Sequence, residues 1–129
     1  MNMFENNAFF WQKLDALFFS SKFVIHYPKN THHEKYINLV YPVDYGYLTD
    51  TSKQEEKPIT AFKGSLSSHF ISSIIVSADI LNKDCAVKLL IGCTPEEERD
   101  ILFFLNQTEF QKTVLMRRGN EVPDWAQND

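Results

Sequence analysis

The sequence contains side chains that could bind phosphate groups, and a smaller set that could hold a metal ion beside them. The donors suited to phosphate oxygens are Lys29, Lys35, Tyr45, Lys57, Lys63, Lys88, Arg117 and Arg118. The carboxylates suited to a divalent cation are Asp44, Asp50, Glu55, Glu56, Asp79 and Asp84. Hydrolysis of a phosphoanhydride needs both sets, because the metal activates water and neutralises the phosphate oxygens. Since charged side chains in loops are mostly just solvated, this composition alone is a weak indication of phosphate chemistry.

The segment 41–48, YPVDYGYL, has a distinctive pattern of three tyrosines with Pro42 and Gly46. It resembles the YP-x-x-YGY signature of the soluble family I inorganic pyrophosphatases, and is most similar to a short, single-domain bacterial branch. The segments FWQKLD, YPKN, KLLIGCTPEE and VLMRR follow that branch in the same order, so the resemblance runs from Trp11 to Gly119. It implies a pyrophosphatase-like, OB-like β-barrel, a Mg²⁺ cofactor and hydrolysis of pyrophosphate.

The resemblance also implies roles for individual residues. It implies catalytic roles for Glu55, Tyr45 and Lys88, and metal binding by Glu55 and Asp84. It implies phosphate binding by Lys29, Lys35, Tyr45, Lys57, Lys88, Arg117 and Arg118. Because the family motif lies on neighbouring strands, we expect one common pocket to contain the side chains of Tyr45, Glu55, Thr60 and Lys88.

Three positions depart from the family pattern where that pattern has carboxylates. In register, the last aspartate of the cluster after the YGY strand falls on Thr60, a central aspartate falls on Lys57, and a later carboxylate falls on Ala86. A hydroxyl and a methyl group offer Mg²⁺ no negative charge, and an inward-pointing lysine would repel it. Glu55 with water alone would bind Mg²⁺ weakly. The sequence therefore predicts a degenerate metal site.

These departures leave two hypotheses for the function. In the first, which the missing ligands favour, the chain is a pyrophosphatase-like protein that is non-catalytic or weakly active and binds a phosphate-bearing anion. In the second, it is a divergent Mg²⁺-dependent diphosphatase that holds its metal with Glu55 and Asp84. Phosphate release from pyrophosphate in the presence of divalent cations separates the two hypotheses.

Local patterns predict the elements that must position these residues. A helix is expected near the start of the chain, capped by Asn6 or Asn7. Its predicted buried face consists of Phe10, Leu14, Leu17 and Phe18, widened by Trp11. Extended segments follow at 22–27, 39–48 and 59–64, and the charged segment 49–58 is expected to be a loop.

The second half of the chain has stronger signals. Segments 69–81 and 85–93 predict an antiparallel hairpin around an Asn-Lys-Asp turn. Segment 94–107 predicts a helix with Thr94 as N-cap, Pro95 in the first helical position and Glu97 completing a capping box. A last strand is expected at 112–118, followed by a tail at 119–129. The chain therefore predicts a mostly antiparallel α+β fold with one helix at the start and one near the end.

The length and charge are those of a single domain spanning residues 1–129. The net charge of −4 argues against binding to nucleic acid. The apolar runs are too short for a membrane span, and no signal peptide is visible, so we expect a cytoplasmic protein with two reduced cysteines. The aromatic first helix predicts self-association as a dimer.

Overall fold

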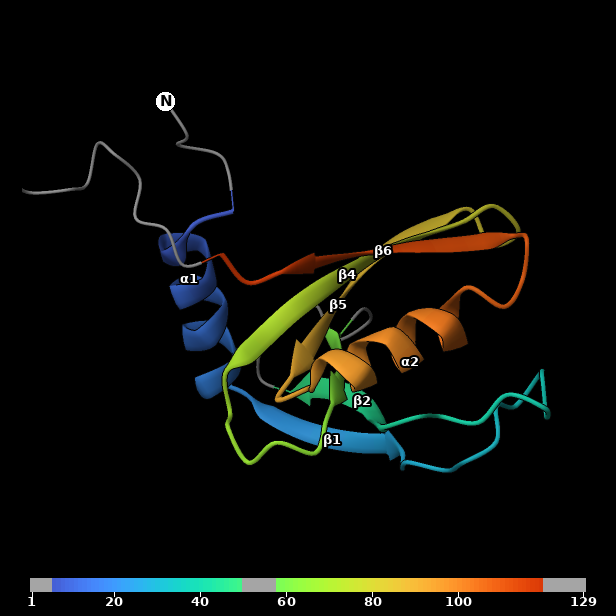
Figure 1. The fold of residues 1–129 in the computed structure, drawn as a ribbon, viewed down its shortest axis with the longest axis horizontal. Coiled ribbons are helices and arrows are strands. Elements are labelled where there is room, and N and C mark those ends of the chain that lie inside the picture. The colour runs from blue at the N-terminus through green and yellow to red at the C-terminus, as the bar shows by residue number, and fades with distance from the viewer. Residues whose placement is uncertain (1–5, 50–57, 120–129) are drawn as a thin grey trace, which may run out of the picture.

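The computed structural model describes residues 6–49 and 58–119, which form an α+β fold (Figure 1). Its elements in chain order are α1 Ala8–Phe19, β1 Lys22–Tyr27, β2 Asp44–Thr49, β3 Thr60–Lys63, β4 Ile71–Asp79, β5 Asp84–Ile91, α2 Pro95–Leu105 and β6 Gln111–Arg117. The strands form one mixed sheet in the order β1-β2-β3-β5-β4-β6. Only β3 and β5 pair in parallel among these described strands. The predicted α+β class, its mostly antiparallel pairing and its two helices are confirmed.

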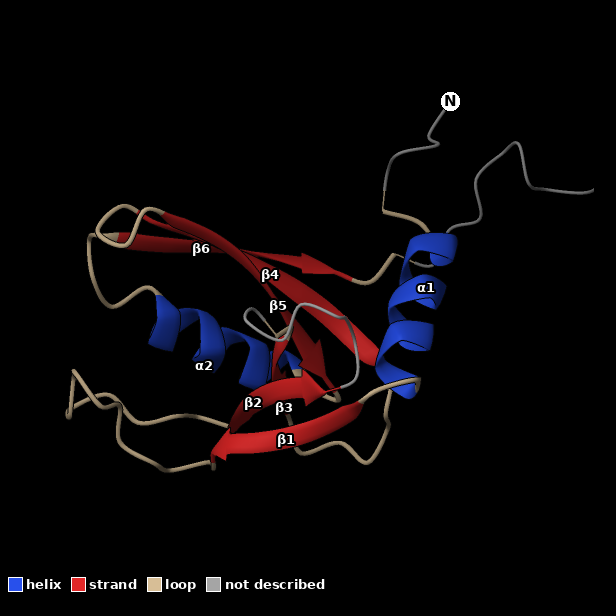
Figure 2. Cartoon of the chain, turned by 180° about the vertical axis from the view of Figure 1, so that it is seen from behind, coloured by secondary structure: helices blue, strands red, loops and turns tan. Residues whose placement is uncertain are grey.

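The predicted closed barrel does not form in the described residues, because their sheet is open. β1 and β6 are its two edges, and Figure 2 shows them at opposite sides of the sheet. Closure would require these edge strands to pair. Instead, side chains form hydrogen bonds with backbone groups of β6. The Thr113 N–H donates to Asn106 Oδ1 at 2.8 Å, and Asn6 Nδ2 donates to the Arg117 carbonyl. Contacts of this kind cover an edge strand without closing a barrel.

The two faces of the sheet have separate apolar cores. On one face, Leu90 belongs to a buried cluster with Ile101 and Phe104 of α2. On the other face, Leu89 belongs to a buried cluster with Trp11 of α1. Neighbouring residues of β5 therefore serve different cores, as expected for a strand whose side chains alternate between the faces of a sheet. This alternation assigns Lys88 to the same face as Leu90, the face that α2 covers.

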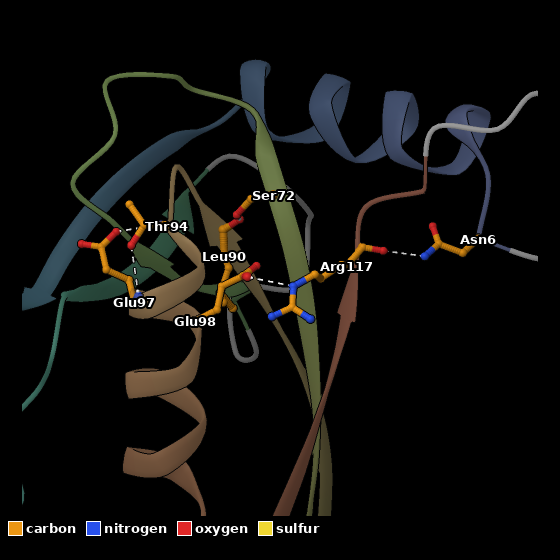
Figure 3. Close-up of polar contacts among 7 residues, drawn as sticks. All are labelled: Asn6, Ser72, Leu90, Thr94, Glu97, Glu98 and Arg117. Atoms are coloured by element: carbon orange, nitrogen blue, oxygen red, sulfur yellow. Dashed lines mark hydrogen bonds and ion pairs between the residues drawn. The ribbon is translucent and has the colours of Figure 1, made fainter.

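The capping signals of α2 are confirmed. The Glu97 N–H donates to Thr94 Oγ1 at 3.1 Å, the Glu97 carboxylate accepts from the Thr94 N–H at 2.9 Å, and Pro95 opens the helix (Figure 3). The same carboxylate accepts from the Ser65 N–H at 3.1 Å, which ties the start of α2 to the segment after β3. Burial raises the pKa of Glu97, but these hydrogen bonds outweigh it and the net pKa is lowered.

The buried face of α1 differs from the prediction by one position. Asn7 caps the helix as expected. Trp11 is fully buried, whereas Phe10 is 41% exposed. Trp11, Leu14 and Phe18 follow the spacing i, i+3, i+7 and pack into the same cluster. Trp11 is therefore the anchor of α1 on the sheet.

Candidate functional site

Lys88 lies near the middle of the sheet, on β5, with neutral neighbours on both sides. Its backbone partners are Thr60 on β3 and Ile75 on β4. Its half-buried side chain donates hydrogen bonds to Tyr45 Oη at 2.8 Å and to Thr60 Oγ1 at 3.2 Å. The structure thus brings together Tyr45, Thr60 and Lys88, three of the four residues that the family resemblance led us to expect in one pocket.

The Lys88 ammonium has no carboxylate within 4.0 Å among residues 6–49 and 58–119, where the two recorded ion pairs involve arginines. An ammonium group has three N–H donors, and two of them are used by the hydroxyls of Tyr45 and Thr60. The third donor bonds to no group of the described chain. Within the described residues, Lys88 therefore has one N–H donor and one positive charge left for a further acceptor.

Tyr45 is held in place by a stack of aromatic rings. Its ring is 5.7 Å from that of Tyr41 at 16°, and Tyr41 stacks on Tyr27 at 4.9 Å and 3°. Lys88 Nζ lies 5.2 Å from the centre of the Tyr45 ring, beyond the hydroxyl to which it donates. Burial raises the pKa of Tyr41 to about 12, and a hydrogen bond to Glu34 raises the pKa of Tyr27. Both phenols therefore stay protonated at neutral pH.

Gly46 allows the strand that carries Tyr45 to lie close to β1. A Cβ atom at this position would lie 1.9 Å from the Val24 carbonyl oxygen, a backbone atom that has little room to move. The glycine in the YGY motif is therefore needed for the β1–β2 packing beside Tyr45, where Ile25 pairs with Gly46.

The predicted phosphate-binding arginines are already paired with carboxylates. Arg117 Nε donates to Glu98 Oε1 at 3.1 Å, linking β6 to α2 on the face that holds Lys88 (Figure 3). Arg118 donates to both oxygens of Asp15, at 3.0 and 2.8 Å, and so binds α1 on the opposite face. Consecutive residues of a strand point to opposite faces, so these two guanidinium groups do not face one ligand together.

Other predicted site residues lie away from Lys88. Lys29 is exposed and bonds through its backbone N–H to Asp44. Lys35 lies in the loop between β1 and β2, where it lines a separate cavity. Asp84 starts β5 four residues before Lys88, roughly 13 Å away along a strand. Ala86 is two residues from Lys88 and shares its face. Glu55 and Lys57 lie outside the described residues, as does the tail beyond Gly119.

The described residues around Lys88 do not fit a Mg²⁺ ion. Mg²⁺ binds through carboxylates, phosphates and water, whereas this site contributes two neutral hydroxyls and a cation. In residues 6–49 and 58–119, no group of three or more histidine, cysteine, aspartate or glutamate side chains is placed to hold a metal. The described groups around Lys88 therefore present positive charge and hydroxyls, and no metal ligands.

Two features of the structure have no signal in the sequence. The Asp15–Arg118 pair joins residues 103 positions apart, so no local spacing indicates it. A cavity beside the tyrosine stack combines Tyr27 and Tyr41 with Phe104 and Phe110, which come from separate elements. A motif matches individual positions along the sequence, so it does not show which distant residues meet in the folded structure.

Comparison with known proteins assigns no family to the chain. The sequence matches no protein-family model, and no curated protein matches it. Within the described part of the chain, neither helix has the length and apolar character needed to cross a membrane. The pyrophosphatase resemblance, the Mg²⁺ cofactor, the dimer and the cytoplasmic location stay predictions.

Proposed function

We propose that the chain is a pyrophosphatase-like protein that binds a phosphate-bearing anion at Lys88 without a metal, and that it turns over pyrophosphate slowly or not at all. The observation that carries this proposal is the environment of the Lys88 ammonium group. It is half-buried, oriented by the hydroxyls of Tyr45 and Thr60, and has no carboxylate partner among the described residues.

A lysine in such a position is costly for the fold. Burial disfavours a charged group unless it is paired, and charged residues away from the surface usually have a counter-ion. Two neutral hydroxyls orient the ammonium but do not neutralise it. A phosphate oxygen would accept the third N–H and supply the missing negative charge. The site thus has the charge of an anion receptor.

The family resemblance supports the same assignment in part. It places Tyr45 and Lys88 in a phosphate site, and these two groups are in contact at 2.8 Å. It also requires carboxylates at the positions of Thr60 and Ala86, which have none. The open sheet gives no support to the barrel that the resemblance implies. The proposal therefore rests on the Lys88 contacts, with the resemblance as a secondary argument.

Calorimetric titration with pyrophosphate in the presence of EDTA tests the proposal. We expect binding without metal, weakened roughly tenfold or more in Lys88→Met because the charge-assisted hydrogen bond is lost. Lys112→Met is the matched control, since it removes an exposed lysine from β6. We expect added salt to weaken binding.

Two outcomes would overturn this function. Binding that requires Mg²⁺ and is followed by phosphate release would establish the alternative, a Mg²⁺-dependent diphosphatase. Metal-free binding that is equally strong in the wild type and in Lys88→Met would place the anion elsewhere on the molecule.

A further inference from the structure

A cavity of about 300 Å³ lies between three segments that are distant in sequence. Its walls come from the loop between β1 and β2, the C-terminal end of α2 with the start of β6, and the turn between β4 and β5. In Figure 1, this loop and the end of α2 extend to the same side of the molecule. The volume is at the lower end of the range for small-molecule sites.

Aromatic side chains form much of the cavity wall. The ring of Tyr41 lies 4.7 Å from Phe104 and 6.0 Å from His33, so the inner wall is a packed set of rings. His33 Nδ1 accepts the N–H groups of Lys35 and Tyr36 at 3.0 and 3.3 Å, which fixes the loop around it. The wall on this side is therefore built from ordered contacts.

The rim of the cavity exposes apolar groups to water. Tyr36 is 46% exposed, Phe110 is 50% exposed and Leu81 is 62% exposed, and all three line the cavity. Apolar side chains gathered at the mouth of a concave site are typical of surfaces that a ligand covers. A ligand with an apolar or aromatic body would remove this area from water.

The electrostatics of the cavity favour a positive charge. Glu34 and Asp79 line it, against Lys35 as the one lining cation among the described residues. Hydrogen bonds in the β4–β5 turn, that of the Asn82 N–H first, lower the pKa of Asp79, and the nearby Lys35 charge adds a smaller contribution. Phe104 and Leu105 place the end of α2 at the wall, and the last turn of this helix has no basic residue. Side-chain amides of Asn106, Gln107 and Gln111 already donate to the last carbonyls of α2, so the negative charge of the lining comes mainly from Glu34.

Glu34 is available to a ligand. One of its oxygens accepts the hydroxyl of Tyr27 at 2.5 Å, and no ion pair of Glu34 is formed within the described residues. Asp79, in contrast, accepts the N–H groups of Leu81 and Asn82 at 3.0 and 3.1 Å and so holds the β4–β5 turn. Glu34 is therefore the carboxylate that would bind an incoming ammonium group.

We infer that this cavity binds a small organic cation, with an ammonium or guanidinium group at Glu34 and an apolar or aromatic body against Tyr36 and Phe110. The rings supply cation–π contacts as well as apolar area. This site is separate from the anion site at Lys88, because Lys88 does not line the cavity. The two sites are opposite in charge, and the stack of Tyr27, Tyr41 and Tyr45 connects them.

Three probes that share one aromatic body test the charge preference: 2-phenylethylammonium, neutral 2-phenylethanol and anionic 3-phenylpropanoate. Each is titrated into the full ¹⁵N-labelled chain at low ionic strength and followed by NMR. We expect the backbone signals of Tyr36, Asn82 and Phe110 to shift, with the ammonium binding roughly fivefold tighter than the carboxylate. Equal or tighter binding of the carboxylate, or no shift of cavity signals with any probe, would overturn the inference.

Three variants locate the charge. Glu34→Gln keeps an acceptor for the Tyr27 hydroxyl but removes the negative charge, so ammonium binding should weaken roughly threefold while 2-phenylethanol binding is unchanged. Glu96→Gln is the matched control, because Glu96 lies in the first turn of α2, at the other end of the helix. Lys88→Met should leave ammonium binding unchanged, which separates this site from the anion site. An equal effect of Glu34→Gln and Glu96→Gln would overturn the placement at Glu34.

Discussion

Lys88 and Arg118 are two partly enclosed cations that the fold treats in different ways. Arg118 donates two hydrogen bonds to the carboxylate of Asp15, and their side chains are 21% and 18% exposed. Lys88 donates to two neutral hydroxyls and has no carboxylate partner in the described chain. The Arg118 charge is neutralised by a carboxylate within the protein. The Lys88 ammonium is held in place by hydrogen bonds, but its charge is not neutralised by the described residues. This difference separates a structural cation from one available to a ligand.

The remaining contacts of Arg118 support a structural role. Its guanidinium also donates to the Ile71 carbonyl at 3.0 Å and lies 6.0 Å from the ring of Trp11. It thereby ties α1, which belongs to no strand ladder, to the start of β4 and the end of β6, two strands that already pair with each other. Lys88, in contrast, links strands β2, β3 and β5, which already pair through their backbones. The fold therefore gains little from the Lys88 charge.

The largest expected effect is on stability. Arg118→Met should lower the free energy of unfolding by about 2–4 kcal/mol, because it leaves the enclosed carboxylate of Asp15 unpaired. Lys88→Met should change it by less than about 1 kcal/mol, since only hydrogen bonds to neutral hydroxyls are lost. Urea denaturation without phosphate measures both values. Equal losses in the two variants would remove the distinction between the two cations.

A carboxylate placed beside Lys88 should make it resemble Arg118. Thr60→Asp puts an acid where Oγ1 now lies 3.2 Å from the ammonium. Metal-free affinity for pyrophosphate should fall roughly tenfold or more, because the new ion pair neutralises Lys88 and the added charge repels the anion. Thr60→Val, which removes the hydroxyl without adding charge, is the control. Unchanged affinity in Thr60→Asp would show that the anion does not reach Lys88.

The pair of Asp15 and Arg118 should also be visible in the pH dependence of stability. Burial raises the pKa of Asp15, but hydrogen bonds from Arg118 and the Ile71 amide outweigh it, and the net pKa is lowered. A lowered folded-state pKa stabilises the protein above the unfolded value of about 3.9, and this stabilisation is lost as the pH falls further. Asp15→Asn should therefore be destabilised by about 1 kcal/mol at neutral pH.

Denaturation curves of both proteins at a series of pH values check this expectation. The difference between wild type and Asp15→Asn should shrink as the pH falls below about 4, because the wild-type carboxyl becomes neutral. Glu97, whose pKa is also lowered, is unchanged in the variant and keeps part of the acid sensitivity in both proteins. A difference that stays constant down to the acid limit would mean that the charge of Asp15 is not what stabilises the pair.

The parts of the fold that the sequence predicted are those determined by near neighbours. The capping box of α2 lies within Thr94–Glu97, and the β4–β5 hairpin closes over a short turn. The parallel pairing of Thr60 with Lys88 joins residues 28 positions apart, and no periodicity in the sequence indicates it. Phe10 and Trp11 are adjacent in α1, so their side chains point in directions that differ by roughly 100°. The apolar pattern alone did not show which of the two rings faces the sheet.

The candidate site was predictable only in part, for a related reason. The meeting of Tyr45 and Lys88, 43 positions apart, was expected from a family resemblance and not from spacing. The same resemblance grouped Arg117 and Arg118 as phosphate ligands, because it does not show that Glu98 and Asp15 stand next to them. Whether a cation is free depends on its neighbours in space. A motif specifies residue types and leaves those neighbours open.

The smallest expected effect concerns the hydroxyl of Tyr45. Tyr45→Phe keeps the ring contacts with Tyr41 and removes the oxygen that accepts from Lys88 at 2.8 Å. The ammonium then loses one of its two orienting bonds, and affinity for pyrophosphate should fall roughly two- to fourfold, near the lower end of the about 0.5–1.5 kcal/mol that one hydrogen bond contributes, because the lost bond does not touch the anion. Tyr36→Phe is the matched control, because Tyr36 lies outside this contact.

The stability of Tyr45→Phe should change little, since the hydroxyl links only groups on strands that are already paired. If Tyr45→Phe instead lowered the free energy of unfolding by more than about 1 kcal/mol and left the affinity unchanged, Lys88 would be a structural cation like Arg118.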